Sequence, residues 1–344
     1  MFSGISMLTS CKCFGFVGTR NLYGSKGHAL SFVAPTFDYI SSYFRLDISF
    51  ISTRTKAMIK SLNIPVGPIC FSICTCPNIV IKLNGRDEFI AYRMSTKPEI
   101  DSEVRDLEKP VFLCRGGRRA VWFPRNPETA KNHLQHVLGV LNKPKLDYLN
   151  FQCDPEDFDL AVVRRNFSEV TTIQTRHHYT MNYYERILAH FPNVPNFFTE
   201  GPLSTKIITQ NFDYLFWHPD PLKLSLGDLL ALNSQRIQIE TSTLSEKLLN
   251  QFLKSWIRGA CRRLKMLEIC LSPANRPFNQ HEIMKRISHQ RNMETREFEL
   301  FGVKQTIRGG MDIRRKDGIL GTVIIDHVRG FSRIKLFVWD HSFS

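Results

Sequence analysis

The chain has 344 residues, 42% of them hydrophobic and 23% charged, which is the composition of a folded protein and excludes a fully disordered one. No run approaches the roughly 20 apolar residues of a membrane span, so we expect no membrane partner. The net charge of +14 permits nucleic-acid binding. The basic residues are scattered, however, and no groove-reading module accompanies them, so we do not expect a nucleic-acid partner.

The nine cysteines are an odd number, and no secretory signal precedes them. They predict reduced thiols in an intracellular protein, cytoplasmic or nuclear and not secreted. Cys70, Cys74 and Cys76 lack the second half of a zinc site and are interpreted as strand residues. We expect no metal and no cofactor.

The first third of the chain changes character twice. Residues 1–43 form an atypical N-terminus with the composition of a disordered tail, and residues 44–66 are expected to form one or two short helices that end before Pro65. Residues 67–125 contain short β-like runs separated by Asn84-Gly85 and Gly116-Gly117, so they predict a β-rich connector.

Residues 126–292 predict a stacked array of helices and strands. Asn126-Pro127 has the form of a helix start, and a helix is also expected over 181–191. An L-x-x-L-x-L strand form recurs with its first position at residues 146, 170, 194, 234 and 264, which leaves room for one irregular repeat around 212–217. Such spacing is typical of leucine-rich repeats. We therefore predict an α/β fold, an irregular leucine-rich-repeat-like stacked helix–strand array.

One helix–strand unit, residues 243–271, is the clearest in the chain. Thr243 and Glu246 have the spacing of a capping box. An apolar stripe follows, with Asn250 among the residues expected on the outer side, and Gly259 stands where a helix end favours a left-handed residue. The members of the stripe are Leu248, Leu249, Phe252, Leu253, Trp256 and Ile257.

The end of the chain predicts β structure. One more helix is expected over 280–292, followed by a C-terminal β segment over 293–344. Asp317-Gly318 lies between alternating runs, which is a strong hairpin signal.

Catalytic motifs are absent from the sequence: there is no P-loop, HExxH or GxSxG, so we expect no enzyme and no catalytic residue. In stacked arrays the strand ends and the loops after them usually bind partners. This geometry predicts substrate contacts at Asp154, His177, Glu200 and Glu240. The alternative for Asp154 is a solvated turn, and for His177 a loop or capping role.

A family resemblance rests on NQFLKSWIRGACRRLKMLEI, which is similar to the signature of the nematode F-box-associated domain, type 2, with its core at about 200–272. The residues that carry this structural signature are Phe252, Leu253, Trp256, Gly259, Leu264 and Leu267. The resemblance implies a domain that captures a protein substrate. It also implies an F-box that docks on a Skp-type adaptor of a cullin–RING ubiquitin ligase.

LDISFISTRTKAMIKSL resembles only the second half of an F-box, and the first half is missing or replaced. If this partial F-box, residues 44–66, still binds the adaptor, the resemblance implies contacts by Leu46, Ile48, Ile51 and Met58. Three interpretations therefore stay open. The chain is a ligase substrate receptor, a repeat-type binding module that does not engage the adaptor, or a basic nucleic-acid-binding protein.

Overall fold

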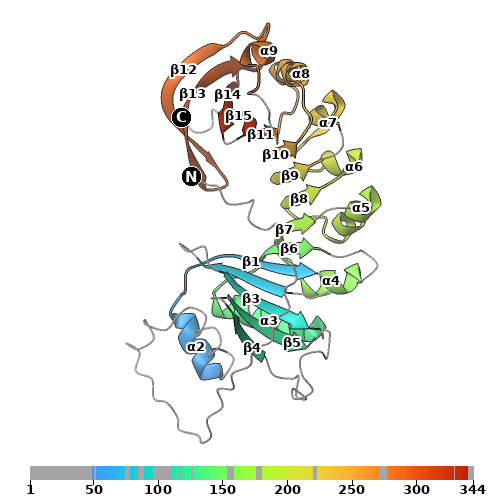
Figure 1. Ribbon diagram of the computed structural model, residues 1–344, viewed down its shortest axis with the longest axis vertical. Coiled ribbons are helices and arrows are strands. Elements are labelled where there is room, and N and C mark those ends of the chain that lie inside the picture. Colours follow the sequence, from blue (N-terminus) through green and yellow to red (C-terminus); the bar gives the residue numbers. More distant parts are fainter. Residues whose placement is uncertain are drawn as a thin grey trace, which may run out of the picture.

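The computed structural model describes residues 49, 52–73, 78–83, 89–95, 111–115, 118–124, 127–152, 159–175, 180–219, 223–271, 277–328 and 330–339. These residues form a mixed α/β fold, as predicted, built on one sheet of 15 strands (Figure 1). The strand order is β12-β13-β14-β15-β11-β10-β9-β8-β7-β6-β1-β2-β3-β5-β4.

The first six elements contain the predicted connector strands. They are α2 (Thr53–Ser61), β1 (Val66–Ile73), β2 (Asn78–Leu83), β3 (Phe89–Ser95), β4 (Val111–Arg115) and β5 (Arg118–Pro124). The Ser52 side chain accepts a hydrogen bond from the Thr55 backbone N–H and caps α2. Strand β1 pairs antiparallel with β2 on one side and parallel with β6 on the other. The connector strands therefore continue the sheet of the array.

The array itself alternates helices with strands. Its elements are α3 (Pro127–Val140), β6 (Leu146–Phe151), α4 (Leu160–Asn166), β7 (Val170–Thr175), α5 (Met181–His190), β8 (Asn196–Glu200), α6 (Thr205–Ile208), β9 (Tyr214–His218), α7 (Leu226–Ala231), β10 (Arg236–Thr241), α8 (Glu246–Ile257) and β11 (Met266–Leu271). Strands β6 to β11 pair parallel, each with the next. A helix joins each strand to its neighbour, and Figure 1 shows α5 to α8 along one side of these strands.

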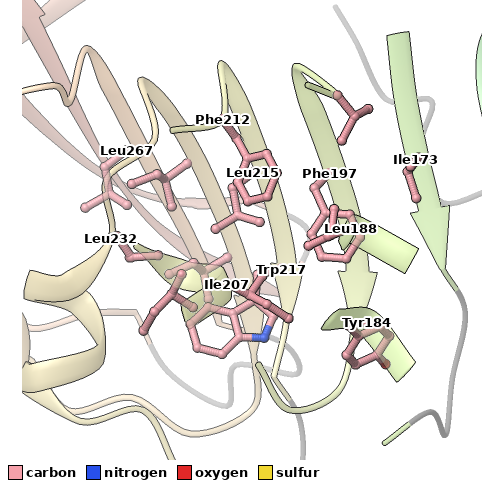
Figure 2. Close-up of a cluster of buried hydrophobic side chains, with 14 of the residues drawn as sticks. Ile173, Tyr184, Leu188, Phe197, Ile207, Phe212, Leu215, Trp217, Leu232 and Leu267 are labelled. Carbon is pink, nitrogen blue, oxygen red and sulfur yellow. The ribbon is translucent and has the colours of Figure 1, made fainter. Parts of the chain in front are cut away.

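The core lies between this row of helices and the sheet. Side chains at equivalent positions of neighbouring strands pair across the whole array and are all buried. The row consists of Phe71, Leu149, Ile173, Phe197, Leu215, Ile237, Leu267, Leu336 and Val323. Figure 2 shows Phe197, Leu215 and Trp217 of this sheet face against Leu188 and Ile207 of the helices. The repeated L-x-x-L-x-L positions thus pair with one another, since each strand needs its neighbour to bury this side.

Helix α8 begins differently from the prediction. Its cap is Ser245, whose side chain accepts a hydrogen bond from the Leu248 backbone N–H. The predicted capping box of Thr243 and Glu246 is therefore wrong, because Glu246 is the first residue of the helix and its carboxylate accepts a hydrogen bond from the Asn279 backbone N–H instead. Gly259 follows the helix with φ +106°, as predicted for a left-handed C-terminal residue.

Asn250 is a second correction in α8. It was expected on the outer side, but it is buried, and its side-chain amide donates hydrogen bonds to the carbonyl oxygens of Ile283 (2.7 Å) and Lys285 (2.9 Å). These bonds satisfy the end of the next helix, α9, so Asn250 joins two helices rather than facing water.

The last elements close the sheet. They are α9 (Gln280–Met284), β12 (Gln290–Leu300), β13 (Val303–Arg314), β14 (Leu320–Val328) and β15 (Phe331–Trp339). The helix expected over 280–292 is wrong beyond Met284, because the chain leaves the helix there and pairs antiparallel with β13 from Gln290 onward. The predicted turn at Asp317-Gly318 is confirmed, with Gly318 at φ +90° between β13 and β14. Strand β15 pairs antiparallel with β11 and joins this segment to the array.

Candidate protein-binding face

Strands β7 to β11 have a second face, which points away from α5–α8 and which we call the helix-free face (Figure 1). Side chains alternate along a strand, so the residues between the buried core positions point to this face. Three rows of paired residues cross it. The strand-by-strand members are Thr172, Asn196, Tyr214, Arg236 and Met266 in the first row, Gln174, Phe198, Phe216, Gln238 and Glu268 in the second, and Glu200, His218, Glu240 and Cys270 in the third.

Aromatic rings gather in the first two rows. The Phe198 ring centroid lies 4.8 Å from that of Tyr214, 5.8 Å from that of Phe216 and 6.0 Å from that of Tyr148 on β6. The guanidinium carbon of Arg236 lies 4.3 Å from the Tyr214 ring centroid. The Tyr214 hydroxyl donates a 2.7 Å hydrogen bond to Gln238, and burial raises the pKa of this phenol to about 12. The cluster is a preformed, partly apolar platform.

The third row carries acidic side chains at the carboxyl ends of the strands. Glu200 pairs with His218, and Glu240 lies one position beyond the pair of Ile239 and Trp217, so it also faces His218. Burial raises the pKa of Glu240, while the nearby His218 and a hydrogen bond from Gln238 lower it. This row therefore places partly desolvated carboxylates next to the aromatic platform.

Neighbouring structure fixes the ends of these strands. The Tyr184 hydroxyl of α5 donates a hydrogen bond to the Glu200 carbonyl oxygen, and the Trp217 indole N–H donates a 2.9 Å bond to the Gly201 carbonyl oxygen. The strand ends that carry the acidic row are thus anchored from the core side, by two buried aromatic residues.

A hairpin of β12 and β13 covers one end of the helix-free face. Phe298 and Ile307 of this hairpin form a buried apolar cluster with Met266 of β11 and Phe337 of β15. Strand β14 pairs with β13 only over Met311–Arg314, so the outer part of the hairpin, which we call the arm (residues 295–308), is free to fold over the sheet. The arm bounds the uncovered strands on one side.

A polar network attaches the arm to the sheet. Arg296 donates hydrogen bonds to both carboxylate oxygens of Asp312 (2.8 and 3.2 Å) and to the Thr322 hydroxyl (2.7 Å). Its guanidinium also lies 4.6 Å from the Trp339 ring centroid. Burial alone would raise the pKa of Asp312, but hydrogen bonds from Arg296, Thr322 and Asn292 outweigh it and lower this pKa.

The structure brings together two of the four predicted substrate contacts. Glu200 and Glu240 lie in the acidic row on β8 and β10, on either side of β9. Asp154 and His177 lie outside the described residues. All four assignments to substrate binding stay predictions. The sequence interpretation missed Phe198, Tyr214, Phe216 and Arg236, although these residues occupy the positions between the repeated core residues and strand alternation identifies them.

The predicted adaptor contacts fall mostly outside the described residues, which exclude Leu46, Ile48 and Ile51. Met58 lies in α2, half-buried and packed against the core. Helix α2 contacts α3. Ser49, which precedes α2, also reaches α3, since its hydroxyl and His136 Nε2 form a 2.9 Å hydrogen bond. Burial, followed by the charges of Lys56 and His133, lowers the pKa of His136 to about 4.

Five of the six predicted structural-signature residues belong to the core, and the sixth, Gly259, follows the end of α8. Phe252, Leu253 and Trp256 are buried on the inner side of α8, Leu264 is buried just before β11, and Leu267 is buried within it. Within the described ranges no group of three or more His, Cys, Asp or Glu side chains is placed to hold a metal ion. The same part of the chain contains no helix long and apolar enough to cross a membrane.

Comparison with known proteins gives a partial match in the same region. Residues 204–269, from α6 to β11, match the family described as F-box associated. The chain is also 26% identical over 227 residues to the F-box associated domain-containing protein sdz-33 of Caenorhabditis elegans, covering 64% of this chain and 69% of that protein. No solved structure matches. The resemblance found in the signature is thereby confirmed: residues 204–269 match the F-box-associated family, and the relative of that description is a nematode protein.

Proposed function

We propose that this protein is a non-catalytic substrate-recognition subunit that resembles the F-box receptors of a cullin–RING ubiquitin ligase. The observation that carries the proposal is the helix-free face. It presents aromatic, amide and acidic side chains in rows on a rigid sheet, and it belongs partly to the segment that matches the F-box-associated family. A flat array of this kind suits binding of another protein.

The array supports the proposal in a second way. We interpret its strand–helix units as leucine-rich-repeat-like, since each unit buries its apolar side only against the next. In such a stack, the strand residues whose side chains point away from the helices are free to contact a partner. We further propose that α2 is what remains of an F-box and that its neighbouring residues contact a Skp-type adaptor. An intracellular location, cytoplasmic or nuclear, follows from this role.

Co-purification tests the proposal. Full-length protein is mixed with a purified Skp-type adaptor, and recovery is compared with that of the variant carrying Leu46→Asp and Ile48→Asp. We expect adaptor recovery with the natural sequence and its loss in the variant at unchanged thermal midpoint. If full-length protein recovers no adaptor, the ligase role is rejected, and the alternative of a binding module without adaptor contact takes its place.

A further inference from the structure

This inference rests on the proposed function and names the chemistry of the bound protein. We propose that the helix-free face binds an extended partner segment through two side chains. The partner's Lys or Arg contacts the acidic row near Glu240. The partner's large apolar residue contacts Val328 and Phe331, which pair with each other at the turn between β14 and β15.

The apolar contact comes from the turn between β14 and β15. Val328 is 43% exposed and Phe331 is 44% exposed, and the two residues are paired in the sheet. Strand alternation from Lys335 and Arg333 places Phe331 on the helix-free face. Ser332, which alternates with them, is buried on the other side. A bulky apolar partner residue would cover an exposed pair that faces the same way as the acidic row.

We expect a positively charged partner residue because the Lys and Arg side chains near Glu240 already interact with other groups. Lys335 forms a 3.2 Å ion pair with Glu268, Arg333 forms a 2.7 Å ion pair with Asp326, and Arg236 lies over the Tyr214 ring. Glu240 forms no ion pair with a Lys or Arg of the described ranges.

The surroundings of Glu240 add to this preference. Cys270 sits beside it in the acidic row, and burial, followed by the charges of Glu268 and Glu240, raises the pKa of this thiol to about 12. The acidic row therefore places two carboxylates, those of Glu200 and Glu240, on either side of β9, although the whole chain has a net charge of +14. A partner cation would be attracted, and a polyanion such as a nucleic acid would be repelled.

The sheet sets the spacing between the two contacts. Glu240 pairs with Cys270, which pairs with Arg333, so two strand-to-strand steps separate Glu240 from β15. Each step is about 4.8 Å, and Phe331 lies two residues, about 7 Å, further along the strand. The separation is about 12 Å, which an extended peptide spans in about four residues at about 3.4 Å each, and side chains four positions apart point to the same side.

Selection from a phage-displayed library of random 12-residue peptides on immobilised full-length protein tests the inference. We expect the selected sequences to share a Lys or Arg and a large apolar residue four positions apart. Synthetic copies of the best sequence then serve as probes in fluorescence anisotropy. Replacing its basic residue by Glu is expected to weaken binding at least tenfold.

Matched variants separate the two contacts from general surface effects. The Glu240→Lys protein should bind the peptide with Glu in place of its basic residue better than the selected peptide itself. The Glu294→Lys protein, changed at an exposed site on β12, should still prefer the selected peptide. Phe331→Ser should weaken binding about tenfold. Phe301→Ser is its control, since Phe301 is 50% exposed at the tip of the arm. Unchanged thermal midpoints show that each variant is folded.

Failure is clear-cut and separable from failure of the ligase role. The inference is overturned if no peptide is selected, or if Glu240→Lys keeps the preference of the natural protein. Adaptor recovery combined with failed selection rejects this inference alone. Successful selection without adaptor recovery rejects the ligase proposal and leaves the binding face in place.

Discussion

Replacing Leu253 by Ala tests whether α8 packs on the array as the apolar stripe predicts. Leu253 is 1% exposed and belongs to the main core cluster. Removing a buried Leu side chain loses its transfer free energy and leaves a cavity, at a combined cost of about 2–5 kcal/mol. A folded domain is stable by only about 5–15 kcal/mol, so one such change removes a large share of the total.

Lys254 supplies the matched control one residue away. Its side chain is only half-buried, so Lys254→Ala should change the free energy of unfolding by less than about 0.5 kcal/mol. Urea unfolding followed by tryptophan fluorescence measures both variants. A loss of about 3 kcal/mol at a slope of about 3 kcal/mol per molar urea lowers the midpoint by about 1 M.

The charged versions sharpen the comparison. Leu253→Asp buries a carboxylate without a partner and should leave little folded protein, whereas Lys254→Asp should fold with nearly the natural midpoint. Equal midpoints for the two Asp variants would refute the assignment of Leu253 to the core side of α8, and with it the placement of the helix row.

Three further predictions concern a glycine of β13, the half-buried His136 and a buried thiol. Gly310→Ala should lower the free energy of unfolding by about 1–3 kcal/mol, because the added Cβ would lie 2.6 Å from Thr322 Cγ2 and Gly310 has φ +124°; an unchanged urea midpoint would contradict this. The folded pKa of His136, about 4, lies below its ordinary 6.5, so the stability that its neutral form contributes is complete above pH 6.5 and is lost as the pH falls toward 4. His136→Gln should flatten that part of the pH profile of unfolding, and identical profiles would rule the linkage out. Cys270, with its pKa raised to about 12 by burial and neighbouring carboxylates, should resist iodoacetamide at pH 8 in the folded protein and react in urea, as mass spectrometry of the alkylated peptides would show.

The sequence predicts the array best where one signal repeats. The recurring strand positions of Leu149, Ile173 and Phe197 place three strands in register, because each buried position must face its equivalent in the neighbour. Local start and stop signals are weaker. Thr243 and Ser245 are both acceptable caps in sequence, and tertiary contact of Glu246 with the start of α9 selects Ser245.

The C-terminal hairpin shows why other features escape sequence analysis. Strands β12 and β13 turn at Phe301 and Gly302, both with positive φ, and Phe is a rare residue in that conformation. No pattern over 280–292 reveals that pairing with β13 will override a helix. Only the acidic part of the candidate face could be predicted from the sequence, since Glu200 and Glu240 lie at strand ends. Phe198 and Phe216 look like ordinary core residues in the sequence, and only the pairing of the strands shows that they point away from the helices.

The same alternation explains why the recognisable segment serves two purposes. Within residues 204–269, Leu215 and Ile237 point to the helices, and Phe216 and Gln238, their direct neighbours in sequence, point to the helix-free face. The signature residues of α8 pack behind the first set, on the far side of the sheet from the acidic row. Under the proposed function, substitutions at Phe216 would change partner choice at a smaller cost in stability than substitutions at Leu215 or Ile237, which belong to the buried core.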